Sequence, residues 1–298
     1  MNFAIPMAET LNMPELPELH VFSLNLNKRF RGLLINDARV HNVRKINTPD
    51  YFRTTFSNTS IKDIERHGKE LYFKMANNNF FNVHLMLNGQ YTVTGHDEAA
   101  KIKGGYASLY FENNEALTIS DITGNARIGL NPKKKSVPDA FSPRFTYKYF
   151  SGKIKKSPYS NIKTFLIDQR TVLGIGNAYS DEILYRAGVS PQSVSSIIPD
   201  EYLKKIYETI PLVLNWAIEN ILKATPDAIN GEERGFMKIH HPDRETTEDG
   251  EKIIVKEIGG KRTYFTAKQK TFNGVVKGTA SPAGKNGNGA SIIEQLWP

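Results

Sequence analysis

The sequence of 298 residues contains no cysteine. This absence excludes disulfide bonds, thiolate zinc sites and cysteine nucleophiles. Long hydrophobic runs are missing too: the run at 80–87 falls far short of the roughly 20 apolar residues that a membrane-spanning helix needs. The first twelve residues hold no lysine or arginine and no long apolar core, so they do not resemble a secretory signal. We therefore expect a globular protein of the cytoplasm.

Basic residues outnumber acidic ones. The chain has 39 Lys and Arg against 31 Asp and Glu, which gives a formal net charge of +8. This balance favours polyanionic partners, because basic side chains neutralise phosphate groups. Solubility or an acidic protein partner would explain the same excess, so charge by itself identifies no partner. The length and the 39% of apolar residues predict a buried core and two domains.

The hydrophobic pattern changes along the chain. Apolar residues recur every three or four positions between 16 and 30, and Gly32 follows, which predicts an amphipathic helix with a glycine stop. Helical spacing returns between 162 and 222, and two short strands around Gly259-Gly260 predict a hairpin. Between the helix at 16–30 and the helical region at 162–222, alternating apolar residues predict strands at 34–40, 71–75, 80–87, 106–111 and 116–119.

These patterns predict an α+β fold. Residues 14–130 are expected to form a β-sandwich domain with a leading helix, 149–235 a helical domain, and 236–272 a β-hairpin domain. Residues 131–148 contain three prolines and three consecutive lysines, which is typical of a linker. Residues 273–298 are rich in Gly, Asn, Ser and Lys, which predicts a flexible basic tail.

Two short motifs carry the most specific signal. Residues 13–18 read Met-Pro-Glu-Leu-Pro-Glu, and residues 174–179 read Gly-Ile-Gly-Asn-Ala-Tyr. The two glycines allow a tight turn to approach a surface closely, and Asn177 is expected to cap the next helix. Because a helix N-terminus binds phosphate, this turn is a candidate anion site. A structural turn between two core helices is the alternative.

Together the motifs resemble those of the formamidopyrimidine-DNA glycosylase and endonuclease VIII family. The resemblance covers residues 13–272 and implies a β-sandwich, a helix–two-turn–helix domain and a C-terminal finger, in that order. It implies base-excision repair, in which oxidised or ring-opened bases are removed and the strand is nicked at the abasic site. The implied partner is double-stranded DNA with such lesions, bound by a monomer in the cytoplasm or bacterial nucleoid. A basic protein with two chance motifs is the remaining alternative.

The resemblance implies that Pro14 is the nucleophile. At a free N-terminus, proline is a secondary amine with a pKa of about 8, which can form an iminium at the sugar C1′. Glu15 matches the family's general acid/base, and Lys69 matches a lysine used for phosphate contact and β-elimination. Glu18 and Glu182 match acidic positions of the family's site, although each glutamate by itself would suit an exposed helix face.

The residues before Pro14 bear on this assignment, because the nitrogen of an internal proline is an amide and cannot act as a nucleophile. In one reading, translation starts at Met13 and its removal exposes Pro14, so the protein is an enzyme. In the other, residues 1–13 are retained and the protein binds damaged DNA without cutting it. We favour the first reading, because the sequence from Pro14 keeps every acidic position of the motif.

The resemblance also implies phosphate contacts in two places. Lys163, Gly176 and Asn177 belong to the helix–two-turn–helix. In the finger, the family's phosphate-gripping arginine falls on Lys261, with Arg262 adjacent. Either cation can serve, but lysine cannot reproduce the bidentate grip of arginine on a phosphate.

A flipped-out base leaves a void in the duplex that the protein must fill. The resemblance makes Leu87 the candidate wedge, with Met86 beside it, although both would also suit the core of a strand. A second family loop, opposite the lesion, corresponds to residues 121–129. This loop keeps an aspartate, Arg127 and a glycine but lacks the family's aromatic residue.

The finger of most relatives holds a four-cysteine zinc site. Here Thr266 stands at a cysteine position, and only His240 and His241 offer nitrogen ligands nearby. Structural zinc needs four converging ligands, so we expect a zincless finger without metal or cofactor. A lesion-recognition loop is expected within 225–236.

Overall fold

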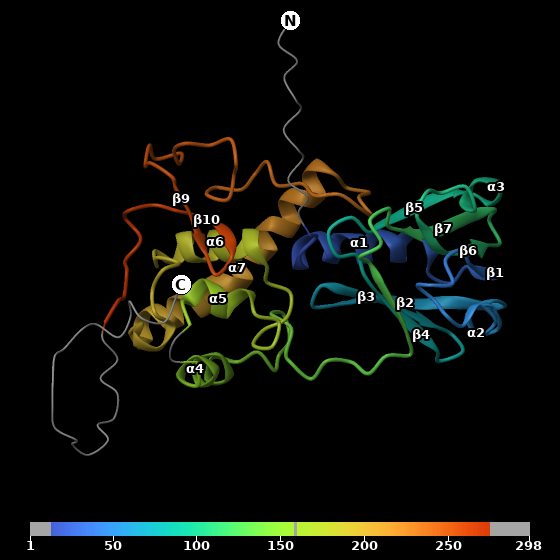
Figure 1. Cartoon of the computed structure of the whole chain (residues 1–298), viewed down its shortest axis with the longest axis horizontal. Coiled ribbons are helices and arrows are strands. Elements are labelled where there is room, and N and C mark those ends of the chain that lie inside the picture. The colour runs from blue at the N-terminus through green and yellow to red at the C-terminus, as the bar shows by residue number, and fades with distance from the viewer. Residues whose placement is uncertain (1–12, 158–159, 275–298) are drawn as a thin grey trace, which may run out of the picture.

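The computed structural model describes residues 13–157 and 160–274, in two lobes that lie side by side (Figure 1). One lobe is a β-sheet structure and the other is helical with a C-terminal hairpin. This arrangement confirms the predicted α+β fold. Most of the predicted basic tail, 275–298, lies outside the described residues. Within the described part of the chain, no helix has the length and apolar character needed to cross a membrane.

The sheet lobe consists of eight strands that pair antiparallel in the order β5-β7-β6-β1-β2-β3-β4-β8. The sheet folds over on itself, so that Phe73 and Tyr91 from its two halves meet with ring centroids 5.8 Å apart. Helices α2 (Pro49–Phe56) and α3 (His96–Ala99) lie at its margins. The strands are β1 (Leu34–Val40), β2 (Thr59–His67), β3 (Glu70–Met75), β4 (Phe80–His84), β5 (Gln90–Gly95), β6 (Gly105–Phe111), β7 (Glu115–Ser120) and β8 (Arg127–Leu130).

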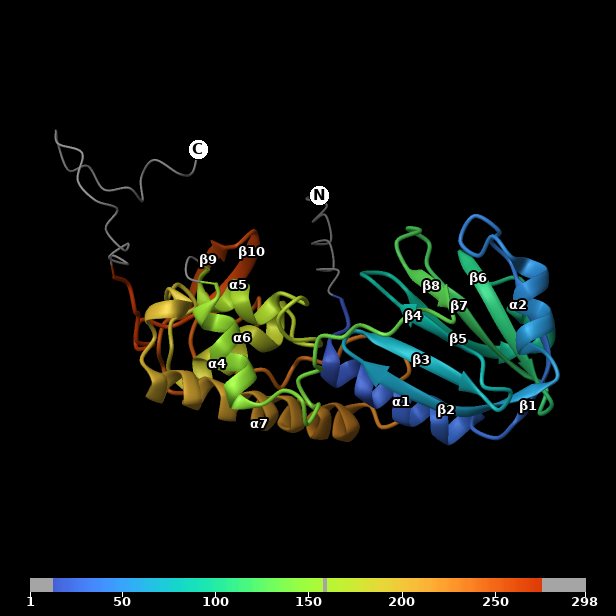
Figure 2. The same ribbon diagram turned by 90° about the horizontal axis from the view of Figure 1, so that it is seen from below.

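Helix α1 (Leu16–Phe30) belongs to both lobes. Leu16 and Val21 are part of the core of the helical lobe, whereas Phe22 and Leu26 are part of the core of the sheet lobe. Figure 2 shows α1 and the long helix α7 (Asp200–Ala224) along the same side of the molecule. The amphipathic helix predicted for this segment is therefore confirmed, and it fixes the position of one lobe against the other.

The helical lobe is built from short helices around α7. Its core combines apolar side chains of α4 (Tyr147–Lys155), α5 (Ile162–Ile167), α6 (Asn177–Ala187) and α7. A short 3-10 turn covers Ser195–Ile197. The predicted hairpin is also present, with β9 (Ile254–Ile258) and β10 (Lys261–Phe265) joined by Gly259-Gly260 and packed against α6.

The predicted linker is tied to the sheet lobe. Lys135 Nζ lies 2.6 Å from the Glu70 carboxylate, and Arg66 forms a two-pronged ion pair with Asp139 in which both side chains are buried. Asp139 also accepts the Gly68 N–H at 2.7 Å. These contacts fix the path between the lobes, while the domain boundaries themselves stay predictions.

Candidate catalytic and DNA-binding site

The acidic residues of the first motif lie in the first turn of α1. Glu15 is the N-cap residue of the helix, and its backbone N–H donates to Glu18 Oε2 at 3.0 Å. Both carboxylates are buried, Glu15 at 3% and Glu18 at 0% exposure. Burial excludes the reading in which these glutamates lie on an exposed helix face.

The glycine turn of the second motif closes directly onto this first turn. Leu16 N–H donates to Gly174 O at 3.2 Å. A Cβ at Gly176 would lie only 2.3 Å from both Glu15 Cδ and Lys69 Nζ. The close approach predicted for the glycines is therefore made against the protein's own candidate site, and it brings Glu15 and Lys69 together.

Capping of α6 differs from the prediction. The helix begins at Asn177 with Gly176 as its N-cap, so Asn177 does not cap it. Glu15 Oε1 accepts the Ala178 N–H at 3.0 Å instead, and the Asn177 side chain donates to Arg262 O at 3.0 Å. The reason is that a buried carboxylate from α1 already occupies the place of a capping side chain.

Lys69 is carried by the turn between β2 and β3, which Asp139 holds through the Gly68 N–H. Burial lowers the pKa of Lys69, while the negative charge of Glu15 opposes that shift. A lysine with a lowered pKa has a larger neutral fraction, which suits transfer of a proton.

Two residues of this site were missed by sequence reasoning. Tyr179 OH donates to Glu18 Oε1 at 2.8 Å, and Arg234 Nε lies 3.2 Å from the same oxygen. Arg234 also donates to the Met13 carbonyl oxygen at 3.2 Å. Tyr179 belongs to the motif at 174–179, but an aromatic residue at that position suggests packing in the hydrophobic core. Arg234 lies within 225–236, where the recognition loop was expected, but nothing in that segment singled out this arginine.

Glu182 is placed apart from this group. Its carboxylate accepts the N–H groups of Lys238, Ile239 and His240 at 2.8–3.2 Å. Burial raises the pKa of Glu182, although the backbone donors oppose the shift. The hydrogen bonds found among the described residues thus make Glu182 an anchor for the segment before the finger, and its predicted catalytic role stays untested.

Lys163 does not agree with the predicted phosphate contact. Its ammonium lies 2.5 Å from Asp181 Oδ1, and neither side chain is accessible to solvent. Burial lowers the pKa of Lys163, and Asp181 opposes the shift. A cation enclosed in this way cannot touch a phosphate directly. A lysine on a short helix reads as exposed, and only the fold reveals its partner eighteen residues later.

Asp181 joins the finger to the helical lobe. Besides Lys163 it accepts His240 Nδ1 at 2.8 Å and the Tyr264 N–H at 3.1 Å, so four segments meet at one carboxylate. We refer to these four residues as the Asp181 junction. A zinc site does not fit here, because thiolates are lacking and His240 Nδ1 is already hydrogen-bonded to Asp181. Among the described residues no cluster of three or more acidic or histidine side chains could hold a metal ion.

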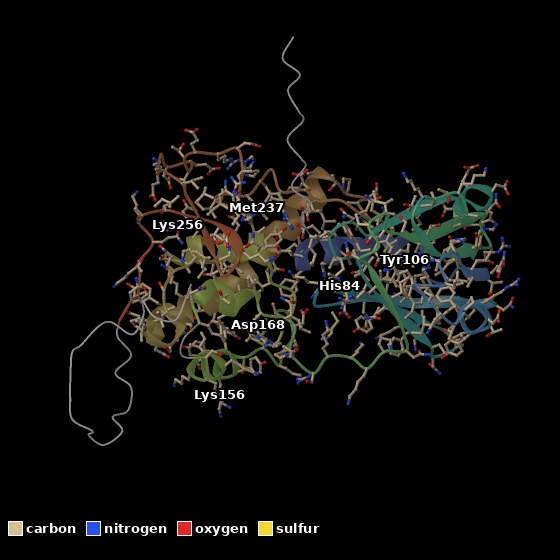
Figure 3. All side chains as sticks on the ribbon, viewed as in Figure 1. His84, Tyr106, Lys156, Asp168, Met237 and Lys256 are labelled. Atoms are coloured by element: carbon tan, nitrogen blue, oxygen red, sulfur yellow. The ribbon has the colours of Figure 1, made fainter. Side chains whose placement is uncertain are left out.

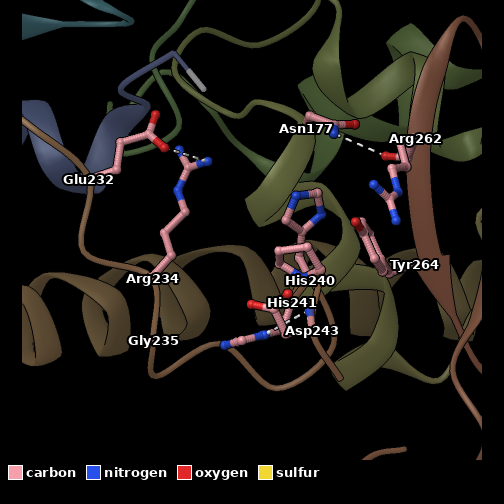
Figure 4. A pocket seen from close by; sticks show the side chains of 10 residues that line it. Asn177, Glu232, Arg234, Gly235, His240, His241, Asp243, Arg262 and Tyr264 are labelled. Carbon is pink, nitrogen blue, oxygen red and sulfur yellow. Dashed lines mark hydrogen bonds and ion pairs between the residues drawn. The ribbon is translucent and has the colours of Figure 1, made fainter. Parts of the chain in front are cut away.

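A pocket of about 360 Å³ opens beside the candidate site, and Arg234 is one of its lining residues (Figure 4). Its lining is rich in donors and includes Asn177, Arg234, His240, His241, Arg262 and Tyr264. Arg262 packs over the Tyr264 ring, with its guanidinium carbon 5.3 Å from the centroid. Lys261 and Arg262 are both exposed at the start of β10, so both remain candidates for the phosphate grip.

The predicted strand over 80–87 is shorter than expected, because β4 ends at His84 and Met86 adopts a left-handed φ of 55° in the turn. Leu87 follows at 44% exposure, which excludes the strand-core reading for it. His84 Nδ1 accepts the Met86 N–H at 3.0 Å and so supports the turn. Figure 3 places His84 at the side of the sheet lobe nearest the helical lobe.

The second predicted DNA loop lies next to this turn. Asn88 Nδ2 donates to Thr123 Oγ1 at 3.1 Å, and the Asp121 carboxylate accepts three backbone N–H groups that fix the loop. Arg127 is exposed at the start of β8. Ile122 at 70% exposure is an apolar residue that sequence reasoning did not single out. Leu87, Ile122 and Arg127 are thus presented on neighbouring exposed segments.

Known proteins are similar to this chain in sequence and in fold. The family model of the formamidopyrimidine-DNA glycosylase N-terminal domain matches residues 13–128, and that of the formamidopyrimidine-DNA glycosylase H2TH domain matches residues 137–226. A formamidopyrimidine-DNA glycosylase of Ureaplasma parvum serovar 3 is 30% identical over 272 residues, which covers 85% of this chain and 98% of that protein. One of Brevibacillus brevis is 26% identical over 271 residues, covering 85% and 97%.

Solved structures agree. The Lactococcus lactis protein in complex with DNA containing FAPY-dG superposes with a TM-score of 0.74 at 25% identity, covering 85% of this chain and 98% of that one. Both family models match, and together they cover most of the chain. The chain therefore belongs to the formamidopyrimidine-DNA glycosylase family.

Proposed function

We propose that this protein is a base-excision repair enzyme that removes oxidised or ring-opened bases from double-stranded DNA and nicks the resulting abasic site. The observation that carries the proposal is the convergence of Glu15 and Lys69 over Gly176, directly beside Pro14. The family membership and the DNA in the Lactococcus lactis complex support the same reaction. Its site of action is the compartment that holds DNA, the cytoplasm or nucleoid of a bacterial cell.

The first chemical step is attack of the Pro14 amine on the sugar C1′, which expels the damaged base and opens the sugar ring. Glu15 delivers the proton to the ring oxygen. One carboxylate oxygen, Oε1, is held by the Ala178 N–H. The other, Oε2, is buried without a hydrogen-bond partner among the described residues, so it is the oxygen able to carry that proton.

The second step is β-elimination from the iminium. Loss of a C2′ proton expels the 3′ phosphate, and water then releases Pro14 from the sugar. Lys69 is suited to take part, because burial lowers its pKa and its ammonium group lies beside Glu15. The reaction requires a free Pro14 amine, and the match of the family model from residue 13 supports Met13 as the residue removed to create it.

DNA binding uses surfaces around this centre. Gly176 and Asn177 at the start of α6, together with Lys261 and Arg262 of β10, form the proposed phosphate grip. Leu87 is the proposed wedge for the space left by the flipped base, with Met86 supporting the turn and Arg127 near the opposite strand.

Borohydride trapping tests the proposal. The chain is expressed starting at Met13 and, separately, at Met1, and each form is reduced in the presence of a duplex with one abasic site. We expect the Met13 form to be cross-linked to the duplex at Pro14, as identified by mass spectrometry. The Met1 form should not be cross-linked. Glu15→Gln in the Met13 form should excise bases more slowly while still trapping on a preformed abasic site. If neither form is trapped while both bind the duplex, the protein is a noncatalytic lesion-binding protein.

A further inference from the structure

A buried arginine stands in the centre of the candidate site. The Arg234 side chain is 12% exposed, and its guanidinium meets Glu18 and Glu232 at 3.2 Å and Glu15 at 3.9 Å. Burial lowers the pKa of Arg234, but Glu18 and Glu15 outweigh this effect and hold it above the ordinary value, so the group stays cationic. Arg234 comes from the segment between α7 and the finger, outside both sequence motifs.

The same guanidinium lies next to the nucleophile. Arg234 Nη2 donates to the Met13 carbonyl oxygen at 3.2 Å, and the carbon of that group is bonded to the Pro14 nitrogen. Standard bond lengths therefore keep Nη2 within about 6 Å of the Pro14 nitrogen. In a chain that begins at Pro14 this carbonyl is gone, and the guanidinium faces the free amine.

Without Arg234, the charges around the Pro14 amine would favour its protonated form, which cannot act as a nucleophile. Carboxylates of Glu15 and Glu18 stabilise the protonated ammonium form and would raise the pKa of the amine. The positive charge of Lys69 would lower the pKa of the amine, but burial lowers the pKa of Lys69 itself. Lys69 is therefore more easily neutralised than Arg234. Among the described residues, the charged and titratable groups around the site include Glu15, Glu18, Lys69, Lys163, Tyr179, Glu232, Arg234 and Lys261.

We propose that Arg234 is a positioning residue that keeps the Pro14 amine unprotonated near neutral pH and holds Glu18 in place. The inference rests on the proposed function, since it requires Pro14 as the nucleophile. Arg234 acts by charge, through the amine and Glu18. It also lines the pocket shown in Figure 4, so a nucleotide bound there would contact the same guanidinium that conditions the nucleophile.

The test is the pH profile of single-turnover nicking of an abasic duplex by the chain that begins at Pro14. Arg234→Gln removes the charge, and at about 6 Å this should raise the apparent pKa of the acid limb by about one to two units. The rate below the midpoint then falls about 10- to 100-fold and recovers at alkaline pH. Arg234→Lys keeps the charge and should keep the midpoint close to that of the wild type.

Glu18→Gln gives a second, opposite test, because removing a negative charge should move the midpoint downward. This variant keeps the inference testable if Arg234→Gln does not fold. Arg39→Gln is the matched control, since Arg39 is an exposed arginine paired with Asp37 on β1. It should reproduce the wild-type profile.

Two failures are distinguishable in this experiment. If the wild-type chain beginning at Pro14 does not nick, the proposed function itself fails. If the wild type nicks and Arg234→Gln lowers the rate equally at every pH with an unchanged midpoint, only the role of Arg234 is overturned. An unchanged midpoint in Glu18→Gln would overturn it as well.

Discussion

Lys163 Nζ and Asp181 Oδ1 lie 2.5 Å apart in a place that solvent does not reach. The same carboxylate binds His240 and the backbone of Tyr264, so the Asp181 junction connects α5, α6 and β10. In a finger that lacks thiolates, one buried carboxylate thus performs the joining role that zinc would have in a metal-bound finger.

Removing this carboxylate should be strongly destabilising. Asp181→Ala leaves the buried Lys163 ammonium without its partner, and we expect a loss of about 3–5 kcal/mol in the free energy of unfolding, measured by urea denaturation. The double variant Lys163→Met with Asp181→Leu removes both charges and should recover much of that loss. A loss in Asp181→Ala no larger than that of an exposed aspartate would contradict the importance of the junction.

Gly176 should tolerate no side chain. A Cβ there would lie 2.3 Å from Glu15 Cδ and from Lys69 Nζ, so Gly176→Ala must displace one of these groups. We expect strand nicking to fall by about 100-fold or more. Gly152→Ala is the matched control, because Gly152 lies in α4 with nothing within 4 Å of the added Cβ; it should stabilise the protein by about 0.5–1 kcal/mol. Equal activity of the two variants would refute the close approach.

Leu87 should matter for duplex DNA and not for stability. Since the side chain is 44% exposed, Leu87→Ala should change the free energy of unfolding by no more than about 0.5 kcal/mol. Excision of a damaged base from a duplex should fall about 10-fold, because the void left by the flipped base is no longer filled. Nicking of an abasic site in single-stranded DNA should be unchanged.

Leu24→Ala is the control for that comparison, because Leu24 is 45% exposed on α1. It should excise bases from duplex DNA at the wild-type rate. Equal losses for Leu24→Ala and Leu87→Ala would show that general surface changes, not a wedge, cause the effect.

His84 should make stability depend on pH. Burial lowers its pKa to about 4, against about 6.5 in the unfolded chain. Below pH 6.5 His84 binds a proton in the unfolded state but stays neutral in the folded state. The free energy of unfolding is therefore largest above pH 6.5 and declines by up to about 3 kcal/mol as the pH falls to 4. Urea denaturation of the wild type and His84→Gln across this range should reveal the difference. A constant difference between the two proteins would argue against it.

The parts of the fold that were predictable are those set by local sequence. Alternation gave the bounds of β1 at Leu34–Val40, and the helical spacing after Pro14 located α1. The 80–87 prediction was too long because periodicity carries no information about the left-handed φ of Met86. Helix α2, only eight residues long, gave too few turns for its spacing to be recognised.

The candidate site was predictable only where its residues belong to motifs. Glu15, Glu18 and Gly176 stand in two short segments that the sequence analysis singled out, but their contact with one another was not predicted. Arg234 could not be predicted, because its hydrogen bond to Glu18 spans 216 residues. Lys163 was misread for a related reason: whether a lysine is exposed or buried depends on the partner that the fold supplies, and Asp181 supplies it here.

Because α1 contributes to the apolar cores of both lobes, the described part of the chain cannot be cut between the lobes without disrupting one of these cores. A fragment that keeps either lobe alone would lose the packing of this helix against the core of the other lobe. Local opening of the catalytic centre therefore requires disruption of both cores at once, which makes this region part of the most cooperative unfolding unit of the chain. We therefore expect activity and native structure to be lost together when the protein is denatured.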